Sequence, residues 1–419
     1  MKIARLYEIF KQYPQVTTDS RRVVEGSIFF ALRGDNFDGN RFAAQAIADG
    51  AVMAVVDDAS MCPDGANYFV VEDVLTTLQE LARMHRRALG LPVVAVTGTN
   101  GKTTTKELLA AILARKYRVA ATRGNLNNHI GVPLTLLSLS SADEVAVVEM
   151  GASSVGEIAA LCAIAEPDYG IITNIGRAHL GGFGGEAGVR RAKGELYDWL
   201  TEHGGRAFVN STDSVLTTMA EERTKLEWSG YSPATVEGWK SNLAGEYNLY
   251  NIAAAAAVGA HFGVEQEQMR SAVAEYQPTI HRSQVIRTER NVVIADCYNA
   301  NPSSMEAALD NFAKMPLPEG VTRKVALLGD MLELGEWSRE EHAKALVAAR
   351  QAVGAGELLL VGENFAKVAP TERTPSRTVR TFADRAELEK YLTRKPIESA
   401  LVLVKGSHSV GLEMVIPML

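Results

Sequence analysis

Short apolar runs that alternate with helical stretches constrain the fold of this chain more than any other feature. In the middle of the chain these runs are VVAVTG, YRVAAT, EVAVVEMG, YGIITNIG and GRAFVN. A strand that is apolar along its whole length is buried on both faces, which is typical of a parallel sheet covered by helices on both sides. The sequence therefore predicts an α/β fold built around a mostly parallel sheet.

Two breaks in this alternation divide the 419 residues into three predicted α/β domains. The first domain contains SIFFAL, AVMAVVDD and NYFVV as strands and a helix from Asp73 to Leu89, after which LGLP interrupts the pattern. The alternation restarts beyond an alanine-rich helix with NVVIADC, KVALLGD, ELLLVG, TVRTFA and ALVLVKG, which predict a second, smaller doubly wound sheet. Since one core rarely serves so long a chain, we predict separate domains. Their predicted bounds are 1–90, 91–283 and 284–419.

Composition narrows the class of protein. A net charge of −7 argues against a nucleic-acid-binding protein, which needs a basic face for phosphates. The cysteines Cys62, Cys162 and Cys297 lie far apart without CxxC spacing, so neither a disulfide framework nor a zinc site is predicted. MKIARLYEIF is too short and charged for a secretory signal, and no apolar run is long enough for a membrane helix. We expect a soluble cytoplasmic protein without nucleic-acid or membrane partners.

The segment GTNGKTT follows one predicted strand and opens a predicted helix. Its glycines let backbone N–H groups approach phosphate oxygens, and the helix N-terminus adds partial positive charge. Lys102 supplies a cation, and the Thr103 hydroxyl suits Mg²⁺. The spacing is shorter than in the common Walker A loop, because Val96 stands at the position of its first glycine. We interpret the segment as a nucleoside triphosphate site rather than a plain glycine turn.

Two more polar residues follow predicted central strands. Glu149 ends EVAVVEMG, and ligands of open α/β sheets bind outside the carboxyl ends of strands, so it is a candidate Mg²⁺ ligand. The alternative is an exposed glutamate at a strand end. His179 lies in the glycine-rich NIGRAHLGGFGG, but Mg²⁺ prefers oxygen, so its residue type alone does not indicate a metal ligand. A loop histidine without a function remains the alternative.

Other polar segments are open to two interpretations. Asn125, Asn127 and Asn128 in RGNLNNHIGVP suit recognition of a polar substrate, or form a turn. Lys193 belongs to a basic run that is typical of a solvated helix face.

The turns DCYNANPSS and KGSHSV each follow an apolar strand of the last domain. DCYNANPSS offers Asp296, Asn299 and Asn301 for hydrogen bonds, ahead of a helix that we expect Ser303 or Ser304 to cap. Either turn could bind an anion or only cap its helix, and the residues alone do not separate these roles.

Together, these segments resemble the Mur ligase family of peptidoglycan assembly. The resemblance covers essentially the whole chain and rests on TDSRRVVEGSIFFALRGDNFDG, TGTNGKTTTKE, GNLNNHIGVPLTLL, VVEMGAS, NIGRAHLGGFG, AKGELY, DCYNANPSSM and LGDMLELG. TGTNGKTTTKE is similar to the short ATP loop of the family, which explains the missing Walker glycine. The resemblance implies a UDP-sugar-binding α/β domain, a central P-loop ATPase-like domain with a mostly parallel sheet, and a Rossmann-like C-terminal domain that closes over the site.

The resemblance also implies roles for individual residues. It implies catalytic roles for Lys102, Glu149, His179 and Lys193, with Mg²⁺ bound by Thr103, Glu149, His179 and a carbamylated Lys193. It implies ATP contacts for Gly98, Thr99, Asn100, Gly101, Lys102, Thr103, Thr104, Asn248, Asn251, Arg282, Asp296 and Asn299. It implies substrate contacts for Ser20, Arg21, Asp38, Gly39, Asn125, Asn127 and Asn128. Two residues depart from the family pattern: Tyr247 stands where histidine is common, and His408 where arginine is expected.

GNLNN and DCYNANP are most similar to the family member that adds D-alanyl-D-alanine. The implied reaction joins this dipeptide to UDP-N-acetylmuramoyl-tripeptide through an acyl phosphate, in a cytoplasmic monomer. One alternative is an amino-acid-adding ligase on the same scaffold. The other is a P-loop NTPase without ligase activity, which would be expected to carry an aspartate where VVEMG has Glu149.

Overall fold

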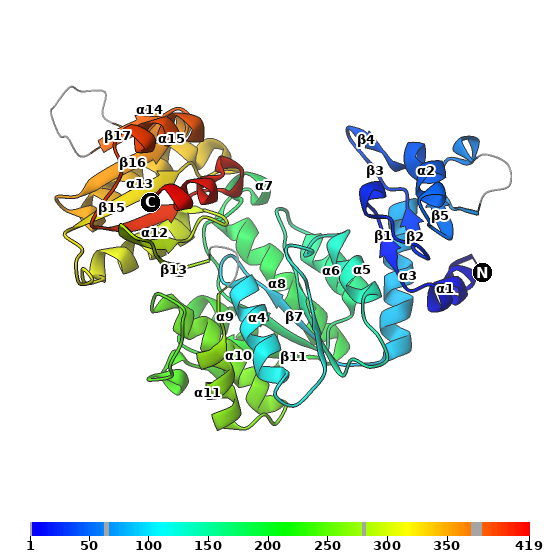
Figure 1. Ribbon diagram of the computed structural model, residues 1–419. Helices are drawn as coiled ribbons and strands as arrows, with labels where there is room; N and C mark the ends of the chain where they lie inside the picture. Colours follow the sequence, from blue (N-terminus) through cyan, green and yellow to red (C-terminus); the bar gives the residue numbers. More distant parts are fainter. Residues whose placement is uncertain (1, 63–66, 279–281, 370–378) are drawn as a thin grey trace.

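The computed structural model describes residues 2–62, 67–278, 282–369 and 379–419. Three α/β units follow one another along the chain, and Figure 1 shows the blue N-terminal unit and the yellow-to-red C-terminal unit at two sides of the central one. The prediction of three α/β domains built on mostly parallel sheets is confirmed. Among the described residues, no helix is long and apolar enough to cross a membrane.

The N-terminal unit is a small parallel sheet with three helices and a short hairpin. Its strand order is β1-β2-β5-β6, and all three pairings are parallel. The strands are β1 (Val16–Thr17), β2 (Ile28–Phe30), β5 (Met53–Val56) and β6 (Tyr68–Val70), and the hairpin is β3 (Arg33–Gly34) with β4 (Phe37–Asp38). The helices are α1 (Lys2–Gln12), α2 (Ala43–Ala48) and α3 (Val74–Leu89).

The central unit is a six-stranded parallel sheet of order β12-β11-β10-β7-β9-β8. The strands are β7 (Val93–Thr97), β8 (Val119–Ala121), β9 (Val145–Glu149), β10 (Tyr169–Ile172), β11 (Arg206–Asn210) and β12 (Glu227–Tyr231). The helices are α4 (Lys102–Leu113), α5 (Gly131–Leu137), α6 (Glu157–Ala165), α7 (Leu180–Phe183), α8 (Glu186–His203), α9 (Ser214–Glu221), α10 (Tyr247–His261) and α11 (Gln266–Glu275).

The strand order of the central sheet explains where a ligand can bind. From β7 the chain runs to β8 and β9 on one side and then returns to β10, β11 and β12 on the other. The strand order therefore reverses beside β7, and such a switch point opens a crevice at the carboxyl ends of the strands. The loops after β7, β9 and β10 all begin at this crevice.

The C-terminal unit is also a six-stranded sheet, of order β13-β14-β18-β15-β16-β17. The strands are β13 (Gln284–Arg287), β14 (Asn291–Ala295), β15 (Arg323–Gly329), β16 (Glu357–Val361), β17 (Val379–Phe382) and β18 (Ala400–Lys405). The helices are α12 (Pro302–Lys314), α13 (Ser338–Val353), α14 (Glu363–Val368) and α15 (Arg385–Arg394).

The prediction that the C-terminal sheet is smaller than the central one is wrong, because both of these sheets have six strands among the described residues. Sequence patterns missed one edge strand in each sheet. Strand β12 has the polar sequence EWSGY, and β13 pairs antiparallel with β14 and is half-exposed along its length. Edge strands lack the continuous apolar run that identifies a buried parallel strand.

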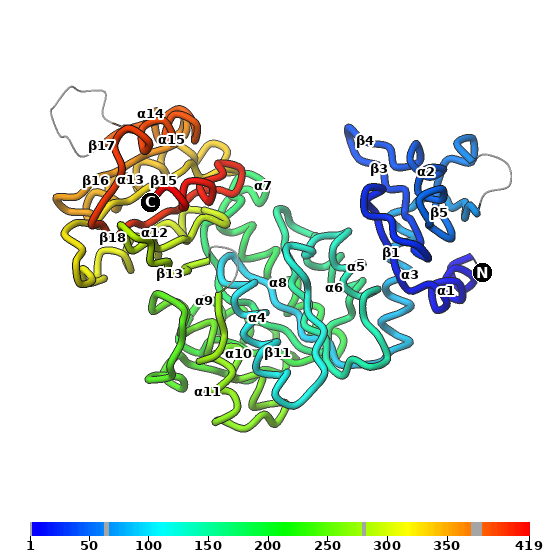
Figure 2. The backbone as a smooth tube through the Cα atoms, viewed as in Figure 1, coloured from blue at the N-terminus to red at the C-terminus, as the bar shows by residue number. Residues whose placement is uncertain are grey.

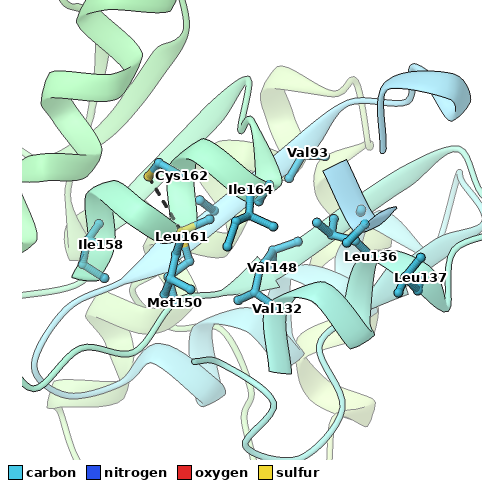
Figure 3. Close-up of a cluster of buried hydrophobic side chains, with 14 of the residues drawn as sticks. Val93, Val132, Leu136, Leu137, Val148, Met150, Ile158, Leu161, Cys162 and Ile164 are labelled. Carbon is cyan, nitrogen blue, oxygen red and sulfur yellow. Dashed lines mark hydrogen bonds between the residues drawn. The ribbon is translucent and has the colours of Figure 1, made fainter. Parts of the chain in front are cut away.

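Buried apolar side chains fill the space between the central sheet and its helices. Figure 3 shows residues of β7 and β9 facing residues of α5 and α6, with the sulfur atoms of Cys162 and Met150 3.9 Å apart. The labelled side chains of this layer are Val93, Val132, Leu136, Leu137, Val148, Met150, Ile158, Leu161, Cys162 and Ile164. The same cluster continues into α1, α3 and β2 of the N-terminal unit, so these two units share a core.

Helix α3 connects the two units, and the tube in Figure 2 passes along it from one to the other. The Asp73 carboxylate caps its first turn by accepting the Thr76 N–H at 2.6 Å, as suits an N-cap. His85 is packed inside, with Nε2 2.9 Å from the Leu139 carbonyl oxygen. The Arg86 guanidinium binds the carboxylate of Asp168 at 2.8 Å and thereby fastens α3 to the central unit.

Candidate functional site

A cavity of about 1070 Å³ lies at the carboxyl ends of the central strands, where the switch point predicts a ligand site. Its walls come from the loops after β7, β9 and β10, from α10, and from the polar turns of the C-terminal unit. A second cavity, of about 860 Å³, lies at the amino ends of β10, β11 and β12 and contains none of the predicted site residues. The first cavity is therefore the candidate site.

The phosphate loop between β7 and α4 is packed so tightly that two of its glycines are required. Gly98 has φ +138°, and a Cβ there would lie 2.0 Å from the Thr173 hydroxyl oxygen. Gly101 has φ +80°, and its Cβ would lie 2.3 Å from Asn251 Oδ1. Since only glycine tolerates both the conformation and the contact, the loop holds its backbone N–H groups close to the cavity.

Lys102 begins α4 and lines the cavity. Its Nζ donates to the carbonyl oxygens of Gly98 and Thr99, at 2.8 and 2.9 Å. Burial lowers the pKa of this ammonium to about 8, although the nearby Glu149 carboxylate favours the charged form. The carbonyl oxygens of the phosphate loop thus hold the Lys102 ammonium group in the cavity.

Residues after β10, which the sequence analysis did not single out, hold the phosphate loop in place. The Asn100 N–H donates to Asn174 Oδ1 at 3.0 Å, and its carbonyl accepts the Thr173 hydroxyl at 2.6 Å. Thr99 Oγ1 accepts the Gly176 N–H at 2.9 Å. No motif marks these bonds in the sequence, because they join residues that are over 70 positions apart.

Glu149 ends β9 with its carboxylate buried beside the phosphate loop. Oε1 accepts the side-chain amide of Asn127 at 2.8 Å, whereas Oε2 has no hydrogen-bond partner among the described residues. A buried carboxylate oxygen without a partner is costly unless something else satisfies it, and a cation would do so. The buried Thr103 hydroxyl lines the same cavity, so Thr103 and Glu149 fit a Mg²⁺ ion.

The donor set for that ion is sparse. Among the described residues, no group of three or more histidine, cysteine, aspartate or glutamate side chains converges on a metal position. A Mg²⁺ ion that keeps waters and takes phosphate oxygens needs only one or two protein ligands. The arrangement therefore suits a metal that arrives with a nucleotide.

His179 lines the cavity at the N-terminus of α7, with φ +49°. Its Nδ1 is hydrogen-bonded to the carboxylate of Glu333, which belongs to the LGDMLELG segment of the C-terminal unit. The segment LGDMLELG contributes to the family resemblance, but no local pattern in it predicts a role for Glu333. The contact places a residue of the central unit against the C-terminal one.

Lys193 of α8 lies just behind the cavity wall. Its side chain is 2% exposed, and Nζ is 3.5 Å from the carbonyl oxygen of Ala152, which lines the cavity. The interpretation of Lys193 as part of a solvated helix face is wrong, because the helix turns this side chain inward. Burial, with a smaller contribution from the charge of Lys102, lowers the pKa of the Lys193 amine to about 7.

Asn248 and Asn251 of α10 form a hydrogen-bonded chain to α4. Asn251 Oδ1 accepts the Thr105 hydroxyl at 3.2 Å, and Asn251 donates to Asn248 Oδ1 at 2.8 Å. Both line the cavity. Tyr247, at the position where histidine was expected, donates to or accepts from the Ser283 hydroxyl at 2.5 Å and so links α10 to the C-terminal unit.

The C-terminal unit brings a second polar group to the cavity. Lys405, buried at the end of β18, binds Asp296 Oδ2 at 2.6 Å. Arg282 lies over the ring of Tyr298 at 3.8 Å, and its buried Nε has no hydrogen-bond partner among the described residues. Arg282, Asp296 and Asn299 were predicted, whereas Lys405 and Tyr298 were missed.

The chain is similar to known proteins along nearly its whole length. Three family models match in order: "Mur ligase family, catalytic domain" over residues 12–99, "Mur ligase middle domain" over 96–237, and "Mur ligase, glutamate ligase domain" over 281–408. The UDP-N-acetylmuramoyl-tripeptide–D-alanyl-D-alanine ligase of Bacillus subtilis is 33% identical, covering 96% of this chain and 92% of its own length. The ligase of the same name from Escherichia coli is 34% identical over 96% of this chain and 91% of its own.

This chain belongs to the Mur ligase family.

Solved structures agree with this assignment. MurF from Acinetobacter baumannii superposes with a TM-score of 0.83 at 32% identity, covering 96% of this chain and 92% of its own. MurF from Thermotoga maritima, solved in complex with ADP, superposes with a TM-score of 0.82 at 26% identity, covering 96% of each chain.

In this Mur ligase, the amides after β8 line the cavity, and their hydrogen bonds serve the fold. Asn128 Oδ1 accepts the N–H groups of Ile130 and Gly131, and Asn125 accepts the Asn127 N–H through its carbonyl. GNLNN therefore forms a turn that lines the cavity, and recognition of a polar substrate by these amides stays a prediction.

The predicted substrate residues of the N-terminal unit lie outside this cavity. Arg21 donates twice to the carboxylate of Asp19, and these hydrogen bonds lower the pKa of Asp19 to about 2 while it caps the turn that contains Ser20. Asp38 caps the next turn, and a Cβ on Gly39 would lie 2.5 Å from the Leu32 carbonyl oxygen. Their substrate contacts stay a prediction.

The helix after DCYNANPSS is capped differently from the prediction. Neither Ser303 nor Ser304 is the N-cap: α12 begins at Pro302, and Asn301 Oδ1 accepts the Ser304 N–H at 2.9 Å. Proline is favoured in the first helical position because it has no N–H to satisfy, which moves the cap to the preceding asparagine.

Proposed function

We propose that this Mur ligase joins D-alanyl-D-alanine to UDP-N-acetylmuramoyl-tripeptide with ATP as the energy source, producing the pentapeptide precursor of peptidoglycan. The observation that carries the proposal is one cavity that combines the phosphate loop, the free carboxylate oxygen of Glu149 and the polar turns of the C-terminal unit. Relatives bearing the name of this ligase align over nearly the whole chain, which supports the choice of substrates.

The proposed chemistry has two steps. The γ-phosphoryl group of ATP passes to the terminal carboxylate of the tripeptide, forming an acyl phosphate, and ADP leaves. The amine of D-alanyl-D-alanine then attacks the acyl carbon, and the tetrahedral intermediate expels phosphate while the amine loses its proton. Positioning and charge stabilisation dominate such a reaction, so Lys102 and the loop N–H groups serve without a nucleophilic side chain.

Mg²⁺, when bound, neutralises charge on the polyphosphate. We propose Thr103 and Glu149 as its protein ligands, with Asn127 orienting the Glu149 carboxylate through the 2.8 Å hydrogen bond. His179 and Lys193 are proposed for a second ion on the strength of the family resemblance. A protonated lysine repels a metal cation, so Lys193 suits this role only as its carbamate.

The environment of Lys193 supports carbamylation. Carbamate formation requires the neutral amine, whose nitrogen attacks the carbon of CO₂ and releases a proton. A lysine pKa of about 7 leaves a large neutral fraction at neutral pH, whereas an exposed lysine is almost fully protonated there. We further propose, from the sequence expectation, that the enzyme is a cytoplasmic monomer.

Phosphate release with each component omitted tests the function. Expected is release that requires ATP, Mg²⁺, UDP-N-acetylmuramoyl-tripeptide and D-alanyl-D-alanine together, with one amide formed per ATP. Glu149→Gln is the matched variant, because it keeps the shape of the side chain and removes the charge; we expect at least about a hundredfold loss of kcat. Release that ignores the dipeptide and the muramyl peptide would refute the ligase activity. A preference for a single amino acid over the dipeptide would favour the amino-acid-adding alternative.

A further inference from the structure

The first turn of α12 in the C-terminal unit contacts the phosphate loop directly. Asn301 Nδ2 donates to Asn100 Oδ1 at 2.8 Å, and Asn100 Nδ2 donates back to Asn301 Oδ1 at 3.4 Å. These two amides are 201 residues apart in the chain and belong to different domains. Both line the candidate cavity.

In the central unit, hydrogen bonds hold the backbone of Asn100 in place. The backbone N–H of Asn100 donates to Asn174 Oδ1, and its carbonyl accepts from both Thr173 and Asn174. The main chain is therefore held by the loop after β10, and only the side chain reaches across to the other domain. A change in the phosphate loop moves Asn100 Oδ1 with it.

On the C-terminal side, the same amide orients a helix. Asn301 Oδ1 caps α12 through the Ser304 N–H, and the Asn301 N–H donates to the Ser304 hydroxyl at 3.0 Å, which completes a capping box. One side chain thus determines both the start of α12 and its distance from the phosphate loop. The helix cannot retreat from the loop without breaking the amide pair.

Further contacts near Asn301 hold α12 against the loop after β10. The Ser303 hydroxyl accepts the Arg177 N–H at 2.7 Å, and a Cβ on Gly176 would lie 2.7 Å from the same hydroxyl. The Arg177 guanidinium also pairs with Glu306 of α12 at 2.6 Å. The turn before α12 carries Asp296 and Tyr298 to the cavity, so the position of α12 determines theirs.

We propose that Asn301 is a positioning residue that ties the placement of the C-terminal domain to the state of the phosphate loop through Asn100. The inference rests on the proposed ligase function and deepens it. An acyl phosphate must be kept from water until the amine attacks, and the C-terminal domain supplies one wall of the cavity. Without the amide pair, the wall is placed less often, and water competes with the dipeptide.

Asn301→Ser separates this role from helix capping. Serine is as good an N-cap as asparagine, but its short hydroxyl cannot reach Asn100. Asn100→Ala removes the same pair without touching the cap, which provides a second variant if the first folds poorly. For both, we expect the ratio of acyl-phosphate hydrolysis to amide formation, measured as the excess of released phosphate over amide, to rise about fivefold, the factor given by one lost hydrogen bond of typical net strength. In Asn301→Ser, KM for ATP should change less than KM for the dipeptide.

The double variant should be no more uncoupled than either single variant, because both remove one interaction. Thermal unfolding of each variant checks that the fold is retained. Additive uncoupling, or a stoichiometry equal to that of the wild type in both single variants, would overturn the proposal.

A second readout does not require ligation. Hydrogen exchange of the backbone amides at the start of α12 is measured in the wild type with and without Mg²⁺ and ADP. We expect the nucleotide to slow exchange there in the wild type and not in Asn301→Ser. Equal responses in the two proteins would overturn the proposal even if ligation is confirmed. A response confined to the wild type would sustain it even if the dipeptide proves to be the wrong substrate.

Discussion

Lys193 is buried and Lys102 is half-buried beside the same cavity. Burial is the main cause of the lowered pKa in each, and the charge of Lys102 lowers the pKa of Lys193 further. Such shifts are common where side chains are arranged for chemistry rather than for stability. They also cost stability, and this cost depends on pH.

Replacing Lys193 with methionine should remove the part of the pH dependence of stability that this lysine causes. The native pKa of about 7 lies below the usual 10.5, so between these values the unfolded chain binds more protons than the native one. The free energy of unfolding of the wild type should therefore rise with pH across this window, relative to the variant, by up to about 1.4 kcal/mol per pH unit. Urea unfolding of both proteins at pH 7 and 9 in CO₂-free buffer measures this change in the free energy of unfolding. Parallel profiles would show that the amine is not buried as described.

A glycine pair tests the packing of the phosphate loop. Gly101→Ala should destabilise the protein by well over 1 kcal/mol and weaken ATP binding, because its Cβ would lie 2.3 Å from Asn251 Oδ1 at φ +80°. Gly124→Ala is the control, since it also has positive φ, +56°, but nothing within 4 Å of the added Cβ. The control should lose only about 1 kcal/mol. Equal losses in chemical denaturation would mean that the contact with Asn251 is unimportant.

At the scale of elements, helix α3 shows how a single buried arginine joins two units. Its apolar face packs into the shared core, and Arg86 meets the end of α6 by donating to the Ala165 carbonyl at 3.1 Å and the Asp168 carboxylate at 2.8 Å. The Asp168 carboxylate also accepts the Val93 N–H at the start of β7. The arginine thus fastens the linker helix to the sheet that carries the phosphate loop.

Arg86→Met should destabilise the protein by about 2 kcal/mol, because it leaves the buried Ala165 carbonyl group without its donor and removes a charge-assisted hydrogen bond to the Asp168 carboxylate, which is 48% exposed. Arg87→Met is the matched control. The Arg87 side chain is 62% exposed and pairs with Glu166 in water, so its loss should cost less than about 1 kcal/mol. Denaturant midpoints at constant slope compare the two variants. A similar cost for both would contradict the role assigned to Arg86.

At the scale of the whole molecule, one hydrophobic cluster is shared between two units, whereas others lie within a single unit. One cluster extends from α1 and β2 through α3 into the central sheet, so residues 1–90 share part of their hydrophobic core with the central unit. The C-terminal unit has two clusters that contain only its own residues, one on each face of its sheet. Hydrogen bonds and an ion pair link this unit to the central one, among them Asn100–Asn301, His179–Glu333 and Arg177–Glu306.

Fragments should reflect this division. Residues 284–419 alone should unfold in one cooperative thermal transition, because both faces of their sheet remain covered. Residues 1–90 alone should show no cooperative transition, since α3 loses the partners that bury one of its sides. Circular dichroism against temperature distinguishes the two outcomes. A cooperative transition in the N-terminal fragment would place the boundary of the shared core elsewhere.

Local patterns were enough to predict the buried parallel strands of the central and C-terminal sheets, the phosphate loop and the carboxylate at the end of β9. Each leaves a signal within a few residues, because a buried strand must be apolar and a phosphate loop needs glycines. The same patterns did not predict the edge strands β12 and β13, because half-exposed strands have no continuous apolar run.

The sequence by itself determined the order of the units and the chemistry available at each strand end. Only the tertiary structure decided which strand ends meet. It brought Lys405 to the cavity, Glu333 to His179 and Asn301 to the phosphate loop, and it turned Lys193 inward. The physical reason is that hydrogen bonds and burial depend on distance in space. The pairing of Asn100 with Asn301 joins residues 201 positions apart, and no local pattern records it.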